Sequence, residues 1–439
     1  MKLSWVCALG VFLIGSGAGV AAALNVPHTL HHAKASESHL TEPHRAASHR
    51  AATHAARPAG KSATARGGAS HAAGKAARTG QQAHLTTRGA ARATARRASL
   101  TTRRHRFSER FTASSFASGD IFSEDVTAGE DPVVRQAAID ALDGMNGTAV
   151  VIDPANGRIL AMVNQKLALS PGAEPCSTIK ITVAMAALSE GLVTRDTPVQ
   201  LAGFRMNMTE ALAHSNNLYF EELGRELGFD RVRHYANQFG LGELAGYNIP
   251  GEHLGVYPDH ELPASEGGVG RMCSFGQGVS LTPLQLGAYV AALANGGTLY
   301  YLQHPTTLGE AAALQPKIKR TLDIARYVPD LQDGMAGAVE YGTARRLRAS
   351  FTELPVFGKT GTCSDKGTRF GWFASYSDSP QGSLVTVFFL EGGRPTFGPR
   401  AAELTGAFYK NLWDRNYFLP KGQQTAQVLP PASVTDSQP

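Results

Sequence analysis

The sequence predicts an α+β fold in which helices pack against one antiparallel sheet. Strand-like runs lie near both ends of the region that follows residue 130, and helical segments fill much of 177–300 between them. The sequence contains no internal repeat. Strands at both ends around a helical middle are typical of one domain with a single sheet.

The expected elements follow one another from about Pro132. Apolar residues at helical spacing predict a first helix. Two strand-like runs then enclose the turn cluster Asp153-Pro154-Ala155-Asn156-Gly157, so together they predict a hairpin. The ranges are 133–142 for the helix, 149–152 and 159–163 for the hairpin, 369–376 and 384–390 for two later strands, and 400–413 for a final helix.

Residues 1–24 are predicted to be an export signal. Lys2 provides a short positive start, 5–14 are apolar, and Ala21-Ala22-Ala23 fits a cleavage site. An uncleaved membrane anchor is the alternative, because 3–24 is roughly long enough to span a bilayer. Both interpretations place the main domain outside the cytoplasm.

Residues 25–115 are predicted to be a disordered basic linker. Between 25 and 108 the chain has 15 Lys and Arg against 2 Asp and Glu, and it has too few large apolar residues to form a core. This charge fits contact with acidic envelope polymers, and a solvated tether is the alternative. The basic residues are not interleaved with aromatics, so no nucleic-acid partner is expected. The end of the chain, 419–439, is expected to be a flexible tail.

A serine three residues before a lysine provides the first motif with chemical meaning. Ser177 is expected in the first turn of a buried apolar helix, which places Lys180 on the same face. A buried lysine beside a second positive charge favours its neutral amine, which can take the proton of a serine hydroxyl. Alone, the pair also fits a capping serine and a surface lysine.

Ser215-Asn216-Asn217 lies between two short helical stretches, 209–213 and 218–227. A break between helices can direct a hydroxyl and an amide into a cleft. Ser215 can then relay a proton, and Asn217 can hold a peptide group of a substrate. Taken alone, the triplet also fits ordinary helix capping.

Lys359-Thr360-Gly361-Thr362 follows two apolar residues and is expected on a strand. Alternation places Thr360 and Thr362 on one face and Lys359 on the other. Hydroxyls and an ammonium suit a terminal carboxylate, and Gly361 permits close approach of a ligand backbone. An edge strand with a solvated lysine is the alternative. The three motifs together suit acyl transfer through a serine ester.

The order of the three motifs, with several longer stretches, resembles the transpeptidase domain of penicillin-binding proteins. These are serine acyltransferases that cross-link bacterial peptidoglycan. The resemblance covers about 130–415, and its other stretches are 146–153, 157–163, 239–242, 249–252, 276–286, 342–344 and 372–376. It implies a five-stranded antiparallel sheet flanked by helices, with a helical subdomain, over 130–418.

The resemblance also implies a role for each motif residue. Ser177 is the acylated nucleophile, Lys180 its base and Ser215 the proton relay. The backbone N–H groups of Ser177 and Thr362 form the oxyanion hole. The groups implied to bind a D-alanyl-D-alanine stem peptide or a β-lactam are Asn217, Lys359, Thr360, Gly361 and Thr362. The resemblance implies no metal and no organic cofactor.

The implied activity is peptidoglycan D,D-transpeptidation in the periplasm or at the outer face of the bacterial cytoplasmic membrane, with cell-wall synthesis proteins as expected partners. A D,D-carboxypeptidase would use the same residues and transfer the acyl group to water. A serine β-lactamase and a β-lactam-binding scaffold without turnover are further alternatives.

Three cysteines follow the expected export signal: Cys176, Cys273 and Cys363. We expect all three to be buried free thiols, with one disulfide among them as the alternative. Cys176 stands where the family usually has Gly, and Ile179 where it usually has an aromatic residue.

Overall fold

A computed structural model describes residues 112–394 and 396–420. The export signal expected in 1–24, nearly all of the linker expected in 25–115 and nearly all of the tail expected in 419–439 lie outside these residues. Within the described part of the chain, no helix combines the length and the apolar composition needed to cross a membrane.

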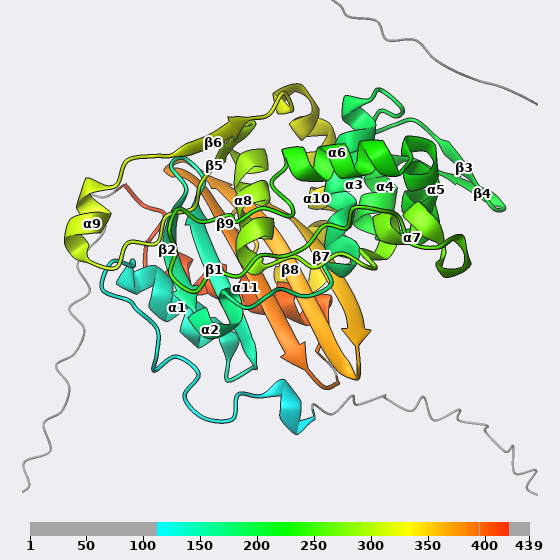
Figure 1. The fold of residues 1–439 in the computed structure, drawn as a ribbon. Helices are drawn as coiled ribbons and strands as arrows, with labels where there is room; N and C mark the ends of the chain where they lie inside the picture. The colour runs from blue at the N-terminus through cyan, green and yellow to red at the C-terminus, as the bar shows by residue number, and fades with distance from the viewer. Residues whose placement is uncertain (1–111, 395, 421–439) are drawn as a thin grey trace, which may run out of the picture. The chain divides into compact units, whose positions relative to one another are not determined.

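The centre of the fold is a five-stranded antiparallel sheet, which confirms the predicted α+β class (Figure 1). Its strands lie in the order β2-β1-β9-β8-β7, so β7 is an edge strand. The expected hairpin is β1 with β2, and the two expected later strands are β8 and β9. The bounds are Gly147–Asp153 for β1, Arg158–Val163 for β2, Val356–Asp365 for β7, Thr368–Ser379 for β8 and Gly382–Gly392 for β9.

Strand β1 shows how the sequence produces a sheet that is buried on both faces. Val150 and Ile152 belong to one apolar cluster, whereas Ala149 and Val151 belong to the other, because successive side chains of a strand point to opposite faces. One cluster includes α8, and the other includes α1 and α11. These helices span Pro283–Ala294, Pro132–Leu142 and Gly398–Asp414.

Most of the other helices form the expected helical subdomain, next to the β7 edge of the sheet (Figure 1). They are α3 Lys180–Ser189, α4 Met208–Ala213, α5 Asn217–Leu227, α6 Phe229–Gln238, α7 Gly268–Phe275 and α10 Val328–Glu340. Two short helices are α2 Gln165–Ala168 and α9 Leu308–Ala313. Two small two-stranded sheets pair β3 Val199–Leu201 with β4 Phe204–Met206, and β5 Thr298–Tyr300 with β6 Ile318–Thr321.

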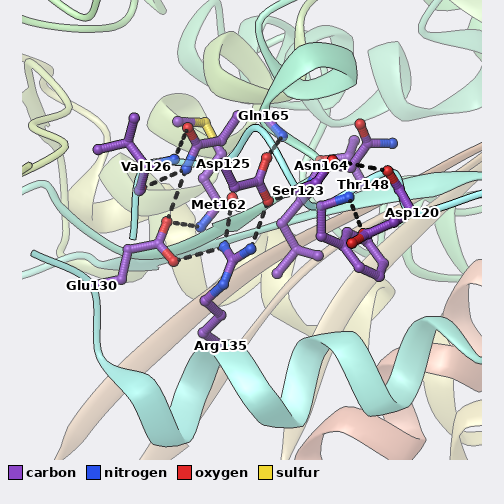
Figure 2. A network of polar contacts seen from close by, with 12 residues as sticks. Asp120, Ser123, Asp125, Val126, Glu130, Arg135, Thr148, Met162, Asn164 and Gln165 are labelled. Carbon is purple, nitrogen blue, oxygen red and sulfur yellow. Dashed lines mark hydrogen bonds and ion pairs between the residues drawn. The ribbon is translucent and has the colours of Figure 1, made fainter. Parts of the chain in front are cut away.

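Arg135 of α1 attaches the segment before this helix to the sheet through a buried polar network (Figure 2). Its guanidinium donates to Asp125 at 2.7 Å and to Glu130 at 2.9 Å. The Asp125 carboxylate also accepts from the backbone N–H groups of Asn164 and Gln165. The side chains of Asp125 and Glu130 are 3% and 0% exposed, and Arg135 pairs with both carboxylates. The ring nitrogen Nε2 of His304 also lies 3.0 Å from Glu130.

We expect Arg135→Met to lower the free energy of unfolding by about 3 kcal/mol, because it removes the arginine that pairs with two buried carboxylates. Urea unfolding followed by circular dichroism measures the change. Arg225→Met is the matched control, since this arginine is 53% exposed and pairs with two glutamates on the surface of α5. Its effect should stay below about 1 kcal/mol. Equal losses of unfolding free energy in the two variants would contradict the view that burial makes the Arg135 ion pairs more important than surface ones.

Candidate active site

Ser177 lies in a single tight turn, the 3-10 helix Cys176–Ile179, which continues directly into α3 at Lys180. The carbonyl of Pro175 fixes this turn by accepting from both the backbone N–H and the hydroxyl of Thr178, at 3.1 and 2.7 Å. Ser177 itself is partly exposed, whereas Thr178 and Lys180 are fully buried. The nucleophile predicted from the sequence is therefore accessible on a rigid support.

The Lys180 ammonium or amine is surrounded by oxygen atoms from two of the three motifs. Its Nζ donates to Ser177 Oγ at 3.0 Å, to Ser215 Oγ at 3.1 Å and to Asn217 Oδ1 at 2.6 Å. It also donates to the backbone carbonyl of Ser215 at 3.0 Å. The predicted nucleophile, base, relay and amide thus meet at one atom, although Ser177 and Asn217 are far apart in sequence.

Burial lowers the pKa of Lys180 well below its ordinary value, and the nearby charge of Lys359 lowers it further. Glu221 acts in the opposite direction, because a negative charge favours the ammonium. The oxygen atoms around Nζ also favour the ammonium. The net shift of the Lys180 pKa is downward, because the side chain is fully excluded from water. A lowered pKa increases the share of neutral amine, which is the form that can accept a proton from Ser177.

Ser215 occupies the expected break between two helices, α4 and α5. Its backbone has a positive φ of 55°, which turns the chain sharply at this point. The Asn216 side chain then starts α5 by accepting from the backbone N–H of Tyr219 at 3.0 Å. Gly342 packs directly against the carbonyl of Ala213, where an added Cβ would come within 2.1 Å of the oxygen. This contact holds the end of α4 in place just before the Ser215 turn.

The third motif lies on a strand, as predicted. This strand, β7, is at the edge of the sheet, as in the alternative interpretation, but its Lys359 is buried rather than solvated. An added Cβ on Gly361 would lie 2.8 Å from the carbonyl of Pro175, so only glycine allows the strand to approach the Ser177 turn this closely. Lys359 shares this face by alternation. Its side chain is fully buried, it donates to the Thr360 carbonyl at 3.0 Å, and burial lowers its pKa to about 7.

The two threonine hydroxyls of this motif point to the other face and have partners there. Thr360 is 4% exposed, and its hydroxyl donates to Thr343 Oγ1 at 2.7 Å. Thr362 is exposed, and its Oγ1 accepts from the backbone N–H of Gly398 at 2.9 Å. Thr362 therefore retains its own hydroxyl proton for a ligand, whereas the proton of Thr360 is used within the protein.

The expectation of three free buried thiols is wrong. Cys176 and Cys363 form a disulfide with a Cα–Cα distance of 5.6 Å, and Cys273 is the free cysteine of the described chain. The disulfide joins the residue before Ser177 to the residue after Thr362. Burial preference suggested free thiols, but spacing along the sequence contains no information on which cysteines meet in space.

Two further contributors to the site were not assigned such roles from the sequence. Trp372 Nε1 donates to the carbonyl of Glu174 at 3.0 Å, which ties the approach to the Ser177 turn to β8. Thr343 receives the Thr360 hydroxyl. Both belong to stretches that carry the family resemblance, 372–376 and 342–344. The resemblance of these stretches is therefore the sequence signal that points to Trp372 and Thr343 as site residues.

Comparison with known proteins places this geometry in a family. The model of the penicillin binding protein transpeptidase domain matches residues 147–410. Stage V sporulation protein D of Bacillus subtilis is 31% identical over 318 residues, which cover 60% of this chain and 48% of that protein. Peptidoglycan D,D-transpeptidase MrdA of Acinetobacter baumannii is 26% identical over 349 residues, covering 62% and 51%. The chain spans about half the length of these curated relatives.

Solved structures agree on the fold. Pseudomonas aeruginosa PBP2 aligns with a TM-score of 0.56 and 24% identity, over 69% of this chain and 78% of that one. A peptidoglycan glycosyltransferase from Burkholderia ambifaria aligns with a TM-score of 0.56 and 19% identity, over 66% and 98%. The family match covers more than half of the sequence and includes all three motifs. The chain therefore belongs to the family of penicillin-binding protein transpeptidase domains.

Proposed function

We propose that this protein is a peptidoglycan D,D-transpeptidase that forms an ester between Ser177 and a D-alanyl-D-alanine stem peptide and binds penicillin in the same way. The observation that supports this most strongly is the contact of the buried Lys180 amine with Ser177, Ser215 and Asn217. A lysine held in this position has no evident structural purpose, because burying it costs free energy that an apolar side chain would not cost.

In the proposed first step, Lys180 takes the hydroxyl proton of Ser177 while Oγ attacks the carbonyl between the two D-alanines. The backbone N–H groups of Ser177 and Thr362 stabilise the resulting oxyanion. Ser215 passes the proton to the nitrogen of the departing D-alanine, which leaves as its peptide bond breaks. Asn217 orients the donor peptide.

In the proposed second step, an amine of another stem peptide attacks the carbonyl of the Ser177 ester. The new peptide bond forms as the ester C–O bond breaks, and Lys180 passes the proton lost by the amine to Ser177 Oγ, which restores the hydroxyl.

Thr362 binds the terminal carboxylate of the donor before the first step, with Thr360 and Gly361 shaping the strand. Lys359, buried on the other face of β7, attracts the carboxylate through its charge. Lys359 has a pKa of about 7, so its charge contribution depends on pH. The proposed location is the outer face of the cytoplasmic membrane or the periplasm. Proteins of cell-wall synthesis are the proposed partners there.

Mass spectrometry after exposure to benzylpenicillin tests the acylation step. We expect one covalent adduct per chain, located by peptide mapping on the segment that contains Ser177. A purified stem peptide, supplied with and without an acceptor amine, then distinguishes transfer to an amine from transfer to water. Accumulation of a cross-linked dimer supports a transpeptidase, and release of D-alanine without dimer indicates a carboxypeptidase. Failure to form any penicillin adduct would rule out both.

A further inference from the structure

A basic pocket lies next to the third motif, because Thr343 in its wall accepts the hydroxyl proton of Thr360. It has a volume of about 320 Å³ and is lined mainly by His214, Tyr341, Thr343, Arg345, Arg346 and Phe397. We call it the Arg345 pocket. Its walls come from three parts of the chain: the end of α4, the turn after α10 and the start of α11. None of the steps proposed above uses its basic side chains.

The Arg345 pocket is connected directly to two of the motifs. Thr343 receives the hydroxyl of Thr360 from β7, and its backbone N–H donates to the carbonyl of Ala213 at 3.1 Å. His214, which also lines the pocket, is the residue immediately before Ser215. A ligand in this pocket would therefore lie beside the groups proposed to handle the peptide substrate.

Arg345 is the basic side chain of this pocket that has no carboxylate partner among the described residues. Arg346 pairs with Glu403 at 3.4 Å and stacks on Phe397, with 4.9 Å between the guanidinium carbon and the ring centre. His214 pairs with Glu210 at 3.3 Å. The exposed guanidinium of Arg345 has no hydrogen bond or ion pair within residues 112–394 and 396–420.

The hydroxyl of Thr343 adds a second donor. It accepts the proton of Thr360, so its own proton remains available to a ligand in the pocket. A planar guanidinium with a neighbouring hydroxyl donor is a common receptor for a carboxylate. The volume exceeds that of a carboxylate alone and leaves room for the side chain that bears it.

We propose that the Arg345 pocket binds a side-chain carboxylate of the stem peptide, on the residue that precedes D-alanyl-D-alanine. This proposal rests on the proposed function and adds a specificity determinant to it. The terminal carboxylate is the other possible source of the same chemistry. We favour the side chain because the proposed function already assigns the terminal carboxylate to Thr362 and Lys359, on the strand itself.

Equilibrium binding separates these sources without requiring turnover. The full chain with Ser177→Ala is titrated against three dye-labelled peptides that end in D-alanyl-D-alanine, and fluorescence anisotropy gives each Kd. The first peptide has a side-chain carboxylate before that pair, the second has the carboxamide there, and the third retains the side-chain carboxylate but has a C-terminal amide. The first peptide should bind about tenfold more tightly than the second, as expected for a charge-assisted pair at an accessible site.

Adding Arg345→Ala should reduce this tenfold ratio to about one, and Arg345→Lys should retain part of it. The penalty for the C-terminal amide should persist in both variants. Arg326→Ala is the matched control, because it removes an arginine that is 67% exposed and does not line the pocket, and it should keep the full ratio. Ratios between peptides are compared, so a uniform loss of folded protein does not imitate the effect.

The carboxylate proposal is overturned if the Ser177→Ala chain binds the first and second peptides equally well. It is also overturned if the difference between these peptides survives the addition of Arg345→Ala. Loss of the C-terminal amide penalty in Arg345→Ala instead would assign the pocket to the terminal carboxylate and also overturn it. The penicillin adduct on the chain with intact Ser177 is scored separately. If the penicillin adduct forms but the side-chain carboxylate gives no tighter binding, this inference is refuted and the proposed function stands. If the side-chain carboxylate gives tighter binding but no adduct forms, the proposed function is refuted and the binding preference stands.

Discussion

Lys180→Ala should slow acylation of Ser177 by a penicillin by about 10²- to 10⁴-fold, the usual contribution of a positioned general base. The reason is geometric as well as electrostatic. Nζ of Lys180 lies 3.0 Å from Ser177 Oγ, and the structure shows no other side-chain base in contact with that hydroxyl among the described residues. Stopped-flow measurement with a fluorescent penicillin gives the rate constant.

Lys166→Ala serves as the control, because this lysine is exposed on the short helix α2. Ser177 in this variant should be acylated at the parent rate. Ser177→Ala provides the blank. Acylation at an undiminished rate in Lys180→Ala would remove the lysine from the proposed mechanism, even if the adduct still formed on Ser177.

The parent rate should also rise with pH and level off well below 10.5, the ordinary lysine value, because burial lowers the pKa of Lys180. The sign follows from the reactive form: the neutral amine accepts the proton, so rate increases as the ammonium is lost. Lys359 loses its charge near pH 7, which weakens one cause of the lowered pKa, and Glu221 opposes the shift throughout. The rise attributable to Lys180 should be missing in Lys180→Ala. An identical profile in both proteins would point to a different titrating group.

Reduction of the Cys176–Cys363 bond should lower the free energy of unfolding by roughly 2–5 kcal/mol, because the bond closes a long loop and restricts the unfolded chain. The two cysteines are separated by 187 positions, and the loss of entropy in the unfolded chain grows with the length of the closed loop. Urea unfolding with and without dithiothreitol measures the difference.

The double variant Cys176→Ser with Cys363→Ser is the control for this experiment. It should be less stable than the oxidised parent and insensitive to the reductant. Cys273 cannot substitute for either partner, because it is fully buried and burial raises the pKa of its thiol, which suppresses the reactive thiolate. Equal sensitivity of the parent and the double variant to dithiothreitol would show that the reductant acts elsewhere.

The sheet could be predicted because its strands have local features that the sequence displays. The runs around Val150 and Phe388 are apolar and rich in β-branched or aromatic residues, and Asp153-Pro154-Ala155-Asn156-Gly157 marks the intervening turn of the first hairpin. The pairing of β1 with β9, by contrast, joins segments more than 200 residues apart. No local pattern predicts that pairing, and the family resemblance implied a five-stranded antiparallel sheet without its strand order.

The candidate site shows the same division. Ser177 and Lys180 are three residues apart on one helical face, so their contact follows from spacing. The hydrogen bond between the hydroxyls of Thr343 and Thr360 forms because the turn after α10 packs against an edge strand, and no local sequence pattern predicts that packing. The buried attachment of Asp125 to Arg135 was also missed, since a lone acidic residue in a polar stretch predicts a solvated loop.

The covalent link between Cys176 and Cys363 limits how far the Ser177 turn can separate from β7. All the helices from α3 to α10 lie between these two residues in sequence, so they form a closed ring whose ends meet beside Ser177 and Thr362. Rocking of these helices against the sheet cannot pull the two proposed oxyanion donors far apart while the ring is intact. Any widening around Ser177 to admit the proposed stem peptide would therefore involve the α4–α5 junction, which carries Ser215 and Asn217.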